Sequence, residues 1–417
     1  MGRRGRRLAG ARRKPADALP ALPGRVRGGA HPGPRALQGG RRRLLTISGG
    51  RVLAPEGGFE RRDLAVADGR IVDAVHGGET LDASGLLVLP GMVDIHGDAF
   101  ERQIMPRPGV HFPLDVALLD SDRQMAANGI ATAYHAVTWS WEPGLRGRGT
   151  LVALMAALEA LAGRLMVDTR LHLRIETFNL DAVDELCAWM GAGKVDLLAF
   201  NDHFEEICEQ CRDARKIGKY AERAGLAHDA FLDLLEEVRK GAPEVPAAMR
   251  RVAAAAEAAG VVRLAHDEET LEDRSLYRSL GARVSEFPEI AAVAREAVRA
   301  GEAVVFGAPN VLRGGSHTGS PGAAEMVREG LCTVLASDYY YPAMLLAPFR
   351  LAEDGVLPLE EAWPLVSANP ARAAGLNDRG ALAEGMRADI LLVDPSGPVP
   401  RPAAAPAGGR LLRFGIG

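Results

Sequence analysis

Short apolar runs alternate with longer amphipathic stretches along most of the chain. Eight of these runs have the length and composition of buried strands, and Ala- and Leu-rich segments of helical length separate them. Eight strands with helices between them are typical of a (β/α)8 barrel, so we predict an α/β protein with this fold. The expected strands are residues 87–95, 130–137, 171–176, 195–201, 261–265, 282–286, 303–307 and 332–337.

The main alternative for this alternation is a doubly wound open sheet. It is disfavoured because no Gly-rich dinucleotide fingerprint follows the first expected strand. The spacing is uneven at one place, where about 60 residues separate the fourth and fifth strands. The segment at about 204–260 is charged and helical. We expect it to be an insertion over the barrel mouth or a contact between copies in a homo-oligomer.

Shorter strands are predicted at both ends of the chain. Residues 44–86 hold short apolar runs separated by Gly-containing turns, and residues 380–394 hold a matching pair around a Glu-Gly turn. We therefore expect one small β-sandwich domain built from both segments, beside a barrel over residues 87–379. Residues 395–417 are rich in Pro, Ala and Gly and are expected to be a loose tail.

Composition places the chain among ordinary globular proteins. The 417 residues are 47% hydrophobic and 25% charged, and no apolar run approaches the roughly 20 residues that a membrane span requires. The four cysteines in so long a chain do not indicate a disulfide framework. A cytoplasmic protein without a membrane partner is therefore expected.

The charge is unevenly distributed. Residues 1–43 carry twelve Arg, one Lys and a single acid, Asp17, and thus about +12, whereas the whole chain carries −4. This Gly- and Pro-rich segment has no hydrophobic period, so we expect a disordered basic extension. A nucleic-acid or lipid-binding arm is one interpretation. An over-extended reading frame is favoured, so no nucleic acid is expected as a partner.

The first barrel strand ends in a pair of metal-type side chains. His96 and Asp98 close the segment Leu-Pro-Gly-Met-Val-Asp-Ile-His-Gly-Asp at residues 89–98. Side chains at i and i+2 of an extended backbone point to one side, and barrel enzymes keep their chemistry at the carboxyl ends of strands. An imidazole and a carboxylate together suit a divalent metal. A hydrogen-bonded structural pair is the alternative.

Other expected strands also end in acids, amides and imidazoles. Ionised acids gathered in a partly dry site repel one another unless a cation offsets them. A shared metal centre is therefore predicted, and histidines with carboxylates fit zinc, manganese or iron. The strand-end residues are Glu176, Asp202, His203, His266, Asp267, Glu268, Glu286, Asn310 and Asp338.

Asp338 follows Thr-Val-Leu-Ala-Ser at the end of the last expected strand. A carboxylate there can bind metal and accept a proton from water that the metal has acidified. An N-cap on the next helix is the alternative. We favour the catalytic role because of the acids and imidazoles at the other strand ends.

Two loops carry candidate anion-binding groups. Late barrel loops often form phosphate sites, and Arg313 supplies a forked cation beside Gly N–H groups and side-chain donors. Arg107, in the Pro-Arg-Pro-Gly turn after the first metal pair, would face a second anionic group; a plain rigid turn is the alternative. The expected substrate-binding residues are Arg107, Asn310, Arg313, Gly314, Gly315, Ser316 and His317.

Several of these motifs resemble those of the amidohydrolase superfamily, namely residues 89–98, the ending at 380–394 and Asp338. Further motifs resemble more closely the PhnM family, the α-D-ribose 1-methylphosphonate 5-triphosphate diphosphatases of phosphonate utilisation. The similarity runs from about residue 44 to residue 394. Its motifs are PRPGV at 106–110, GIATAYHAV at 129–137, LHLRIE at 171–176, NDH at 201–203, AHDEET at 265–270, EFP at 286–288, GAPNVLRGGSHTG at 307–319 and SDYYYPAMLLAPFR at 337–350.

The resemblance implies metal-dependent hydrolysis of a phosphoanhydride in a phosphorylated sugar, release of diphosphate and co-operation with carbon–phosphorus lyase enzymes. It implies one or two divalent ions, zinc in the first place and manganese or iron otherwise, with Asp338 as the catalytic residue. Hydrolysis of a cyclic amide or deamination on the same fold stays open, as does a non-catalytic scaffold. The implied metal ligands are His96, Asp98, Glu176, His203, His266 and Asp338.

Overall fold

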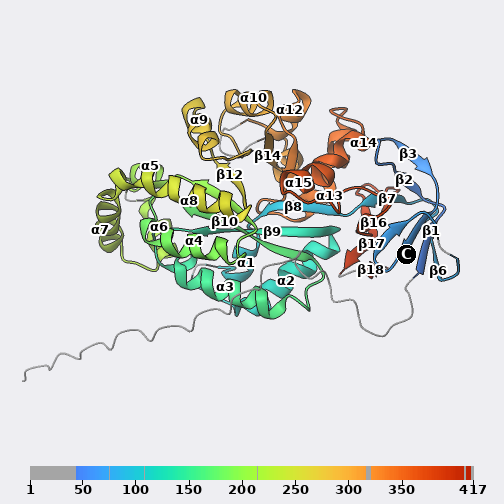
Figure 1. The fold of residues 1–417 in the computed structure, drawn as a ribbon, viewed down its shortest axis with the longest axis horizontal. Coiled ribbons are helices and arrows are strands. Elements are labelled where there is room, and N and C mark those ends of the chain that lie inside the picture. Colours follow the sequence, from blue (N-terminus) through green and yellow to red (C-terminus); the bar gives the residue numbers. More distant parts are fainter. Residues whose placement is uncertain are drawn as a thin grey trace, which may run out of the picture.

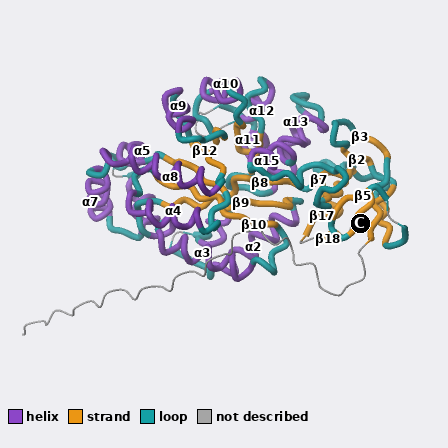
Figure 2. The backbone as a smooth tube through the Cα atoms, in the orientation of Figure 1, coloured by secondary structure: helices purple, strands orange, loops and turns teal. Residues whose placement is uncertain are grey.

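A parallel eight-stranded sheet surrounded by helices forms the centre of the computed structural model (Figures 1 and 2). The structure describes residues 44–414 except 75, 108, 214, 316–320 and 408–409, so the basic extension predicted at 1–43 lies outside the described residues. The barrel strands are β8 (Met92–Gly97), β9 (Ile130–Trp139), β10 (Asp168–Glu176), β11 (Leu197–Asn201), β12 (Val262–His266), β13 (Val284–Glu286), β14 (Ala303–Gly307) and β15 (Val334–Ala336).

These strands follow one another around the sheet in chain order, from β8 to β15. A bridge between Gly97 and Asp338 joins the first strand to the segment after the last one, which nearly closes the barrel. Neighbouring strands in chain order pair in parallel throughout. The predicted (β/α)8 architecture is confirmed, and each of the eight predicted runs overlaps a barrel strand.

Apolar side chains from the strands form one continuous cluster below the carboxyl ends of the barrel. Leu264 of β12 and Val284 of β13 belong to this cluster. Side chains two positions apart share a face of a strand, so the same faces continue to His266 and Glu286. Along β12 and β13, the barrel interior therefore changes from an apolar to a charged layer within two residues.

The barrel helices pack against the outside of the strands (Figure 2). Among the helices that the structure describes, none combines the length and the hydropathy that crossing a bilayer requires. The barrel helices are α1 (Phe100–Ile104), α2 (Leu114–Ala127), α3 (Arg148–Leu161), α4 (Val183–Gly191), α8 (Val245–Ala259), α9 (Leu271–Ser279), α10 (Ala291–Arg299), α11 (Ala308–Arg313), α12 (Ala323–Arg328), α13 (Pro342–Glu353), α14 (Leu359–Ala362) and α15 (Ala368–Ala373).

The segment between β11 and β12 divides into two parts. Its last helix, α8, packs against α4 and belongs to the barrel wall. The earlier helices are α5 (Phe204–Gln210), α6 (Ile217–Ala224) and α7 (His228–Arg239), which lie together at one end of the molecule (Figure 1). Their apolar side chains pack with Trp141 and Phe178, which follow β9 and β10. These helices therefore stand beside the loops at the carboxyl ends of the strands.

Segments from both ends of the chain form a second region of two sheets (Figure 1). One sheet has the order β5-β4-β1-β6 and the other β18-β17-β16-β7-β2-β3. Side chains of both sheets share one apolar core, as in a sandwich. The strands are β1 (Leu44–Ser48), β2 (Arg51–Leu53), β3 (Phe59–Arg61), β4 (Leu64–Ala67), β5 (Arg70–Val72), β6 (Glu79–Asp82), β7 (Leu87–Pro90), β16 (Ile390–Asp394), β17 (Arg401–Ala407) and β18 (Arg410–Arg413).

The structure corrects the sequence analysis at two places in this region. The loose tail expected over 395–417 is wrong for residues 401–407 and 410–413, because β17 pairs with β16 and β18 with β17. Small side chains such as Ala404 and Ala405 are buried there but give little hydrophobic signal. The single strand expected over 87–95 is two strands, since β7 pairs in the sandwich and β8 in the barrel. An unbroken apolar run does not mark this change of partner.

An ion-pair cluster connects the barrel to the segment that leads into β16. The Asp168 carboxylate, on β10, lies 2.5 Å from an Arg379 nitrogen and 3.0 Å from an Arg387 nitrogen. Burial alone would raise the pKa of Asp168, but the charges of Arg170 and Arg379 outweigh it and lower this pKa well below its ordinary value. The carboxylate is therefore charged in the native state at neutral pH.

Replacing this carboxylate by an amide is expected to destabilise the fold. In Asp168→Asn, the Arg379 guanidinium loses its nearest counter-charge in a buried position, so the free energy of unfolding should fall by about 3 kcal/mol at pH 7. Because the native pKa is lowered, the stabilisation is present above pH 3.8 and is lost as the pH falls through the native pKa. Urea unfolding at several pH values measures both effects.

The matched control is Asp233→Asn, which removes an exposed carboxylate on α7. Equal unfolding free energies for Asp168→Asn and this control at pH 7 would contradict the role of the cluster.

Candidate metal centre

Imidazoles and carboxylates from six barrel strands meet at the carboxyl ends of the barrel. Among the described residues, three sets each offer three ligand atoms that lie within 4.8 Å of one another. His96 belongs to two of these sets, so they adjoin. The sets are His96–Asp98–Asp338, His96–His172–Glu286 and His203–His266–Asp267.

Backbone hydrogen bonds between the first and last strands position the first set. The amide of Asp98 donates to the Asp338 carbonyl at 2.9 Å, and the amide of Asp338 donates to the His96 carbonyl at 2.9 Å. The three ligand residues are thus joined through their main chains. Side-chain rotation alone does not separate them.

Asp94 adds a side-chain link between β8 and the segment that follows β15. Its buried carboxylate accepts hydrogen bonds from the Ser337 hydroxyl at 2.6 Å and from the Ser337 amide at 3.0 Å. A Cβ atom at Gly97 would lie 2.9 Å from both the Asp94 carboxylate and the Ser337 hydroxyl. Only glycine therefore allows β8 to approach the last strand this closely.

Nε2 of His172, a buried atom of the second set, has no hydrogen-bond partner among the described residues. Nδ1 of His96 and Oε1 of Glu286, which are also buried, lie 2.8 Å from each other. His172 uses its other ring nitrogen, Nδ1, on the Ile95 carbonyl at 2.9 Å, which orients the ring. An unpartnered buried nitrogen is costly. A cation held by His172 Nε2 together with His96 and Glu286 would satisfy it, so the residues fit a metal with nitrogen and oxygen ligands.

Burial keeps His96 in the form that a metal requires. It lowers the pKa of His96 to about 3, although the neighbouring Glu286 carboxylate opposes this shift. A neutral imidazole has a lone pair available for a cation. The lowered pKa of His96 and the grouping of ligand atoms around it therefore lead to the same assignment.

The third set is already hydrogen bonded within the protein. His203 Nδ1 lies 2.7 Å from the Glu176 carboxylate, and His203 Nε2 lies 3.1 Å from Asp267. Burial alone would lower the pKa of His203, but the charge of Glu176 and the hydrogen bond that the His203 ring donates to Asp267 raise it to about 10. Glu176 thus holds the His203 ring and lies outside the three sets.

Arg174 brings a fixed positive charge into this acidic cluster. The side chain is buried, and its Nη2 lies 2.5 Å from Nε2 of His266. The Asn201 amide oxygen, in the orientation that satisfies both groups, accepts from the same guanidinium at 3.1 and 3.2 Å. The guanidinium therefore partly offsets the carboxylates around it.

Strained backbone marks the rim of the site. Asp267, Phe287 and Asp338 adopt left-handed φ angles of 54°, 55° and 54°, which non-glycine residues rarely adopt. All three follow barrel strands. Strain of this kind persists only where the surrounding structure enforces it, and it concentrates at functional sites.

Asp338 has an unusual acidity. Burial and, after it, the charge of Asp98 raise the pKa of Asp338 to about 7. A carboxyl group of this acidity exchanges a proton near neutral pH, as a general base must. Its position at the joint between β15 and β8 places this group against His96 and Asp98.

Sequence reasoning missed some members of these sets. It predicted His96, Asp98, His203, His266 and Asp338, which all lie in them, together with Glu176, which does not. Asp267 and Glu286 were noted only as strand-end acids. His172 was not considered, although its alternation with Arg174 and Glu176 along one strand was a signal for an inward-facing row.

The predicted anion-binding residues that the structure describes lie in two places, on and directly after α11 and in the turn after α1. Arg313 is exposed at the end of α11, Asn310 is half-buried on the same helix, and Arg107 is exposed in the turn after α1. Ser316 and His317 lie outside the described residues.

The expectation that Gly314 and Gly315 present free N–H groups is wrong. These groups donate to the carbonyls of Val311 and Asn310 instead. The last carbonyls of a helix need donors, and Gly314 in its left-handed conformation supplies one.

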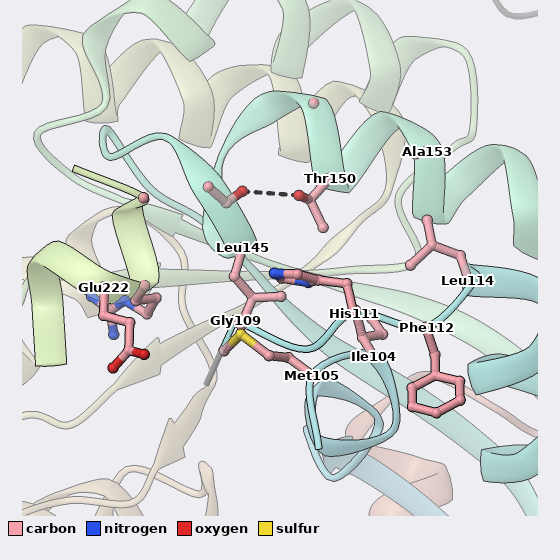
Figure 3. A pocket seen from close by; sticks show the side chains of 14 residues that line it. Ile104, Met105, Gly109, His111, Phe112, Leu114, Leu145, Thr150, Ala153 and Glu222 are labelled. Carbon is pink, nitrogen blue, oxygen red and sulfur yellow. Dashed lines mark hydrogen bonds between the residues drawn. The ribbon is translucent and has the colours of Figure 1, made fainter. Parts of the chain in front are cut away.

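A separate cavity of about 430 Å³ lies beside the loops that follow β8 and β9 (Figure 3). His111, Leu145 and Met105 project into it, and Arg223 of α6 borders one side. None of its lining residues belongs to the three sets. The cavity therefore adjoins the loops of the mouth and is separate from the three sets.

Comparisons with known proteins place these features in a family. Residues 218–408 match the model described as Amidohydrolase family. The alpha-D-ribose 1-methylphosphonate 5-triphosphate diphosphatase of Escherichia coli is 32% identical over 324 residues, which cover 75% of this chain and 85% of that protein. A dihydroorotase from Citrifermentans bemidjiense is 26% identical over 407 residues, covering 84% and 90%.

Solved structures share the fold at low identity. An amidohydrolase crystal structure gives a TM-score of 0.60 at 15% identity and covers 90% of this chain and 100% of its own. The D-hydantoinase from a Bacillus species gives 0.59 at 14% identity, with 88% and 95% covered. These likenesses support the barrel architecture.

Metal analysis tests the three sets directly. After dialysis against zinc, the protein is expected to retain about one or two equivalents. His96→Asn should lose most of this metal because His96 serves two sets, and His172→Asn should bind zinc at least about tenfold more weakly. Inductively coupled plasma mass spectrometry and zinc titration measure both values.

His135→Asn is the control, because His135 is a buried histidine on β9 outside all three sets. Retention of the wild-type zinc content by His96→Asn would rule out this centre.

Proposed function

The chain belongs to the amidohydrolase superfamily and, within it, to the family of the Escherichia coli diphosphatase, and on this premise we propose that it is a metal-dependent diphosphatase. The proposed substrate is α-D-ribose 1-methylphosphonate 5-triphosphate, cleaved at a phosphoanhydride with release of diphosphate. The observation that carries the proposal is the match to this enzyme along most of its length.

The ligands for the cation come from the sets around His96. His96 would share one or two divalent ions with the other members of its two sets, namely Asp98, Asp338, His172 and Glu286. Zinc fits these nitrogen and oxygen donors, with manganese or iron as alternatives. When bound, such a cation acts as a Lewis acid that polarises phosphoryl oxygens and acidifies water. The carboxylates offset its charge.

Asp338 is the proposed proton acceptor. Its backbone bonds to His96 and Asp98 fix the carboxylate at the mouth of the barrel. The pKa raised by burial leaves a large fraction of this group ready to take a proton near neutral pH. A water attacking phosphorus must lose a proton, and Asp338 is positioned to receive it.

Exposed arginines at the mouth favour an anionic substrate. Arg313 ends helix α11, which follows β14, and Arg107 stands in the turn after α1, which follows β8; neither belongs to the three acidic sets. A guanidinium donates two parallel hydrogen bonds to phosphate oxygens. Arginines in these places would hold phosphate groups while the reacting phosphorus lies near Asp338.

Hydrolysis of a cyclic amide is the second candidate function. Dihydroorotase and allantoinase relatives at 25–27% identity favour it. The same barrel and the same acids would serve either reaction, so substrate trials must include dihydroorotate.

The proposed product indicates the next reaction. Removal of diphosphate leaves the methylphosphonate group of the sugar intact, so an enzyme that cleaves a carbon–phosphorus bond must consume this product. We therefore propose co-operation with carbon–phosphorus lyase enzymes.

Product analysis decides between these functions. The zinc-loaded protein is expected to release diphosphate from the ribosyl triphosphate, and Asp338→Asn should lower kcat at least about 100-fold because the proton acceptor is lost. Diphosphate is quantified by phosphorus NMR, and the metal content of both proteins is measured alongside.

Release of single phosphates only would mean that the wrong bond has been assigned. Turnover of dihydroorotate in place of the triphosphate would reverse the preference between the two functions. Asp233→Asn serves as the control for an amide substitution remote from the mouth.

A further inference from the structure

Two exposed arginines converge on one tyrosine beside Asp338. Arg102 lies on α1, which follows β8, and Arg313 ends α11, which follows β14. Tyr339 stands directly after Asp338, where β15 lies between β14 and β8 around the barrel. Arg102 Nη2 donates to the Tyr339 carbonyl, and Arg313 Nη1 donates to the Tyr339 hydroxyl at 3.3 Å. Three neighbouring strands thus bring two cations to one residue.

These two arginines differ from two others that follow other barrel strands, Arg146 after β9 and Arg223 after β11. Arg146 is paired with Glu101 at 3.2 Å, and Arg223 with Glu142 at 2.6 Å, so carboxylates already offset both charges. Within the described part of the chain, Arg102 and Arg313 form no ion pair, and their hydrogen bonds to Tyr339 have neutral acceptors. A neutral acceptor orients a guanidinium but leaves its charge and most of its five donors for a ligand.

The spacing of the two cations suits an extended anion. Arg102 contacts the main chain of Tyr339 and Arg313 contacts the far end of its side chain. The two guanidinium groups are therefore held at opposite ends of one residue. Separate phosphate groups along a chain match this arrangement better than one phosphate does.

We propose that Arg102 and Arg313, positioned by Tyr339, form a bracket that binds the phosphates of a linear polyphosphate away from the reacting bond. The inference deepens the proposed function and rests on it for the triphosphate substrate. The carboxylates of Asp98 and Asp338 repel phosphates near the metal centre. Cations outside the acidic sets are therefore needed to hold the remaining phosphates of the polyphosphate. Arg102 and Arg313 supply these cations, and Tyr339 positions both guanidinium groups.

Binding of inorganic tripolyphosphate tests the bracket without turnover of the sugar substrate. Isothermal titration with the zinc-loaded protein is expected to show about tenfold weaker binding for Arg102→Met and for Arg313→Met, since each loses a charge-assisted contact. Inorganic phosphate should bind all proteins alike within about twofold, because one phosphate does not span both arginines. Metal content measured after each titration detects stripping by the polyphosphate.

Arg123→Met is the matched control, since Arg123 is an exposed arginine on α2. Tyr339→Phe removes the hydroxyl that holds Arg313 and keeps the carbonyl that holds Arg102. It should weaken tripolyphosphate binding less than either arginine variant and leave the protein folded. Arg102→Lys, which keeps the charge without the fork, should bind better than Arg102→Met.

The outcomes separate the bracket from the proposed reaction. Equal tripolyphosphate affinity in Arg102→Met, Arg313→Met and Arg123→Met overturns the bracket, even where diphosphate is released from the ribosyl triphosphate. Weakened binding in the two bracket variants alone supports the bracket, even where the ribosyl triphosphate is not cleaved and the proposed function fails.

Discussion

The closure of the barrel between β8 and β15 is the constraint on which the site depends. Two backbone hydrogen bonds join His96, Asp98 and Asp338, which come from opposite ends of the barrel sequence. The Asp94 carboxylate holds Ser337 beneath them, and Gly97 leaves the room for this contact. A barrel that failed to close here would separate the ligand residues. The backbone contacts that close the barrel are therefore the same contacts that bring these ligand residues together.

The closed barrel concentrates charge that the protein alone does not balance. Carboxylates of Asp98, Glu286 and Asp338 approach neutral imidazoles, and Arg174 offsets only part of the negative charge. Among the described residues, Nε2 of the buried His172 has no hydrogen-bond partner. A cation bound in the acidic centre would be one positive site at the mouth, and the arginines beyond the centre are further ones. Positive charges placed in this way suit a substrate with one reacting phosphoryl group and further phosphates at a distance.

The barrel strands could be predicted because strands buried on both faces are continuous apolar runs. The strand-end residues followed from the same pattern, since polar side chains directly after such runs must gather at one edge. His172 lies within its run, so only the alternation along β10 distinguishes it. The hydrophobic pattern does not show which sheet a strand joins. One apolar run contains both β7, which pairs in the sandwich, and β8, which pairs in the barrel. The strand β17 pairs with β16 although its buried side chains are small alanines. Gly314 and Gly315 satisfy a helix end, which composition did not distinguish from a phosphate loop.

The central claim is that side chains distant in the sequence share one cation at the closing joint. Anomalous diffraction at the zinc edge, from crystals grown with zinc, tests it most directly. The account predicts a peak about 2.0–2.2 Å from a ring nitrogen of His96 and from carboxylate oxygens of its neighbours in the sets. Zinc found only at the protein surface, with no peak between these side chains, would contradict it.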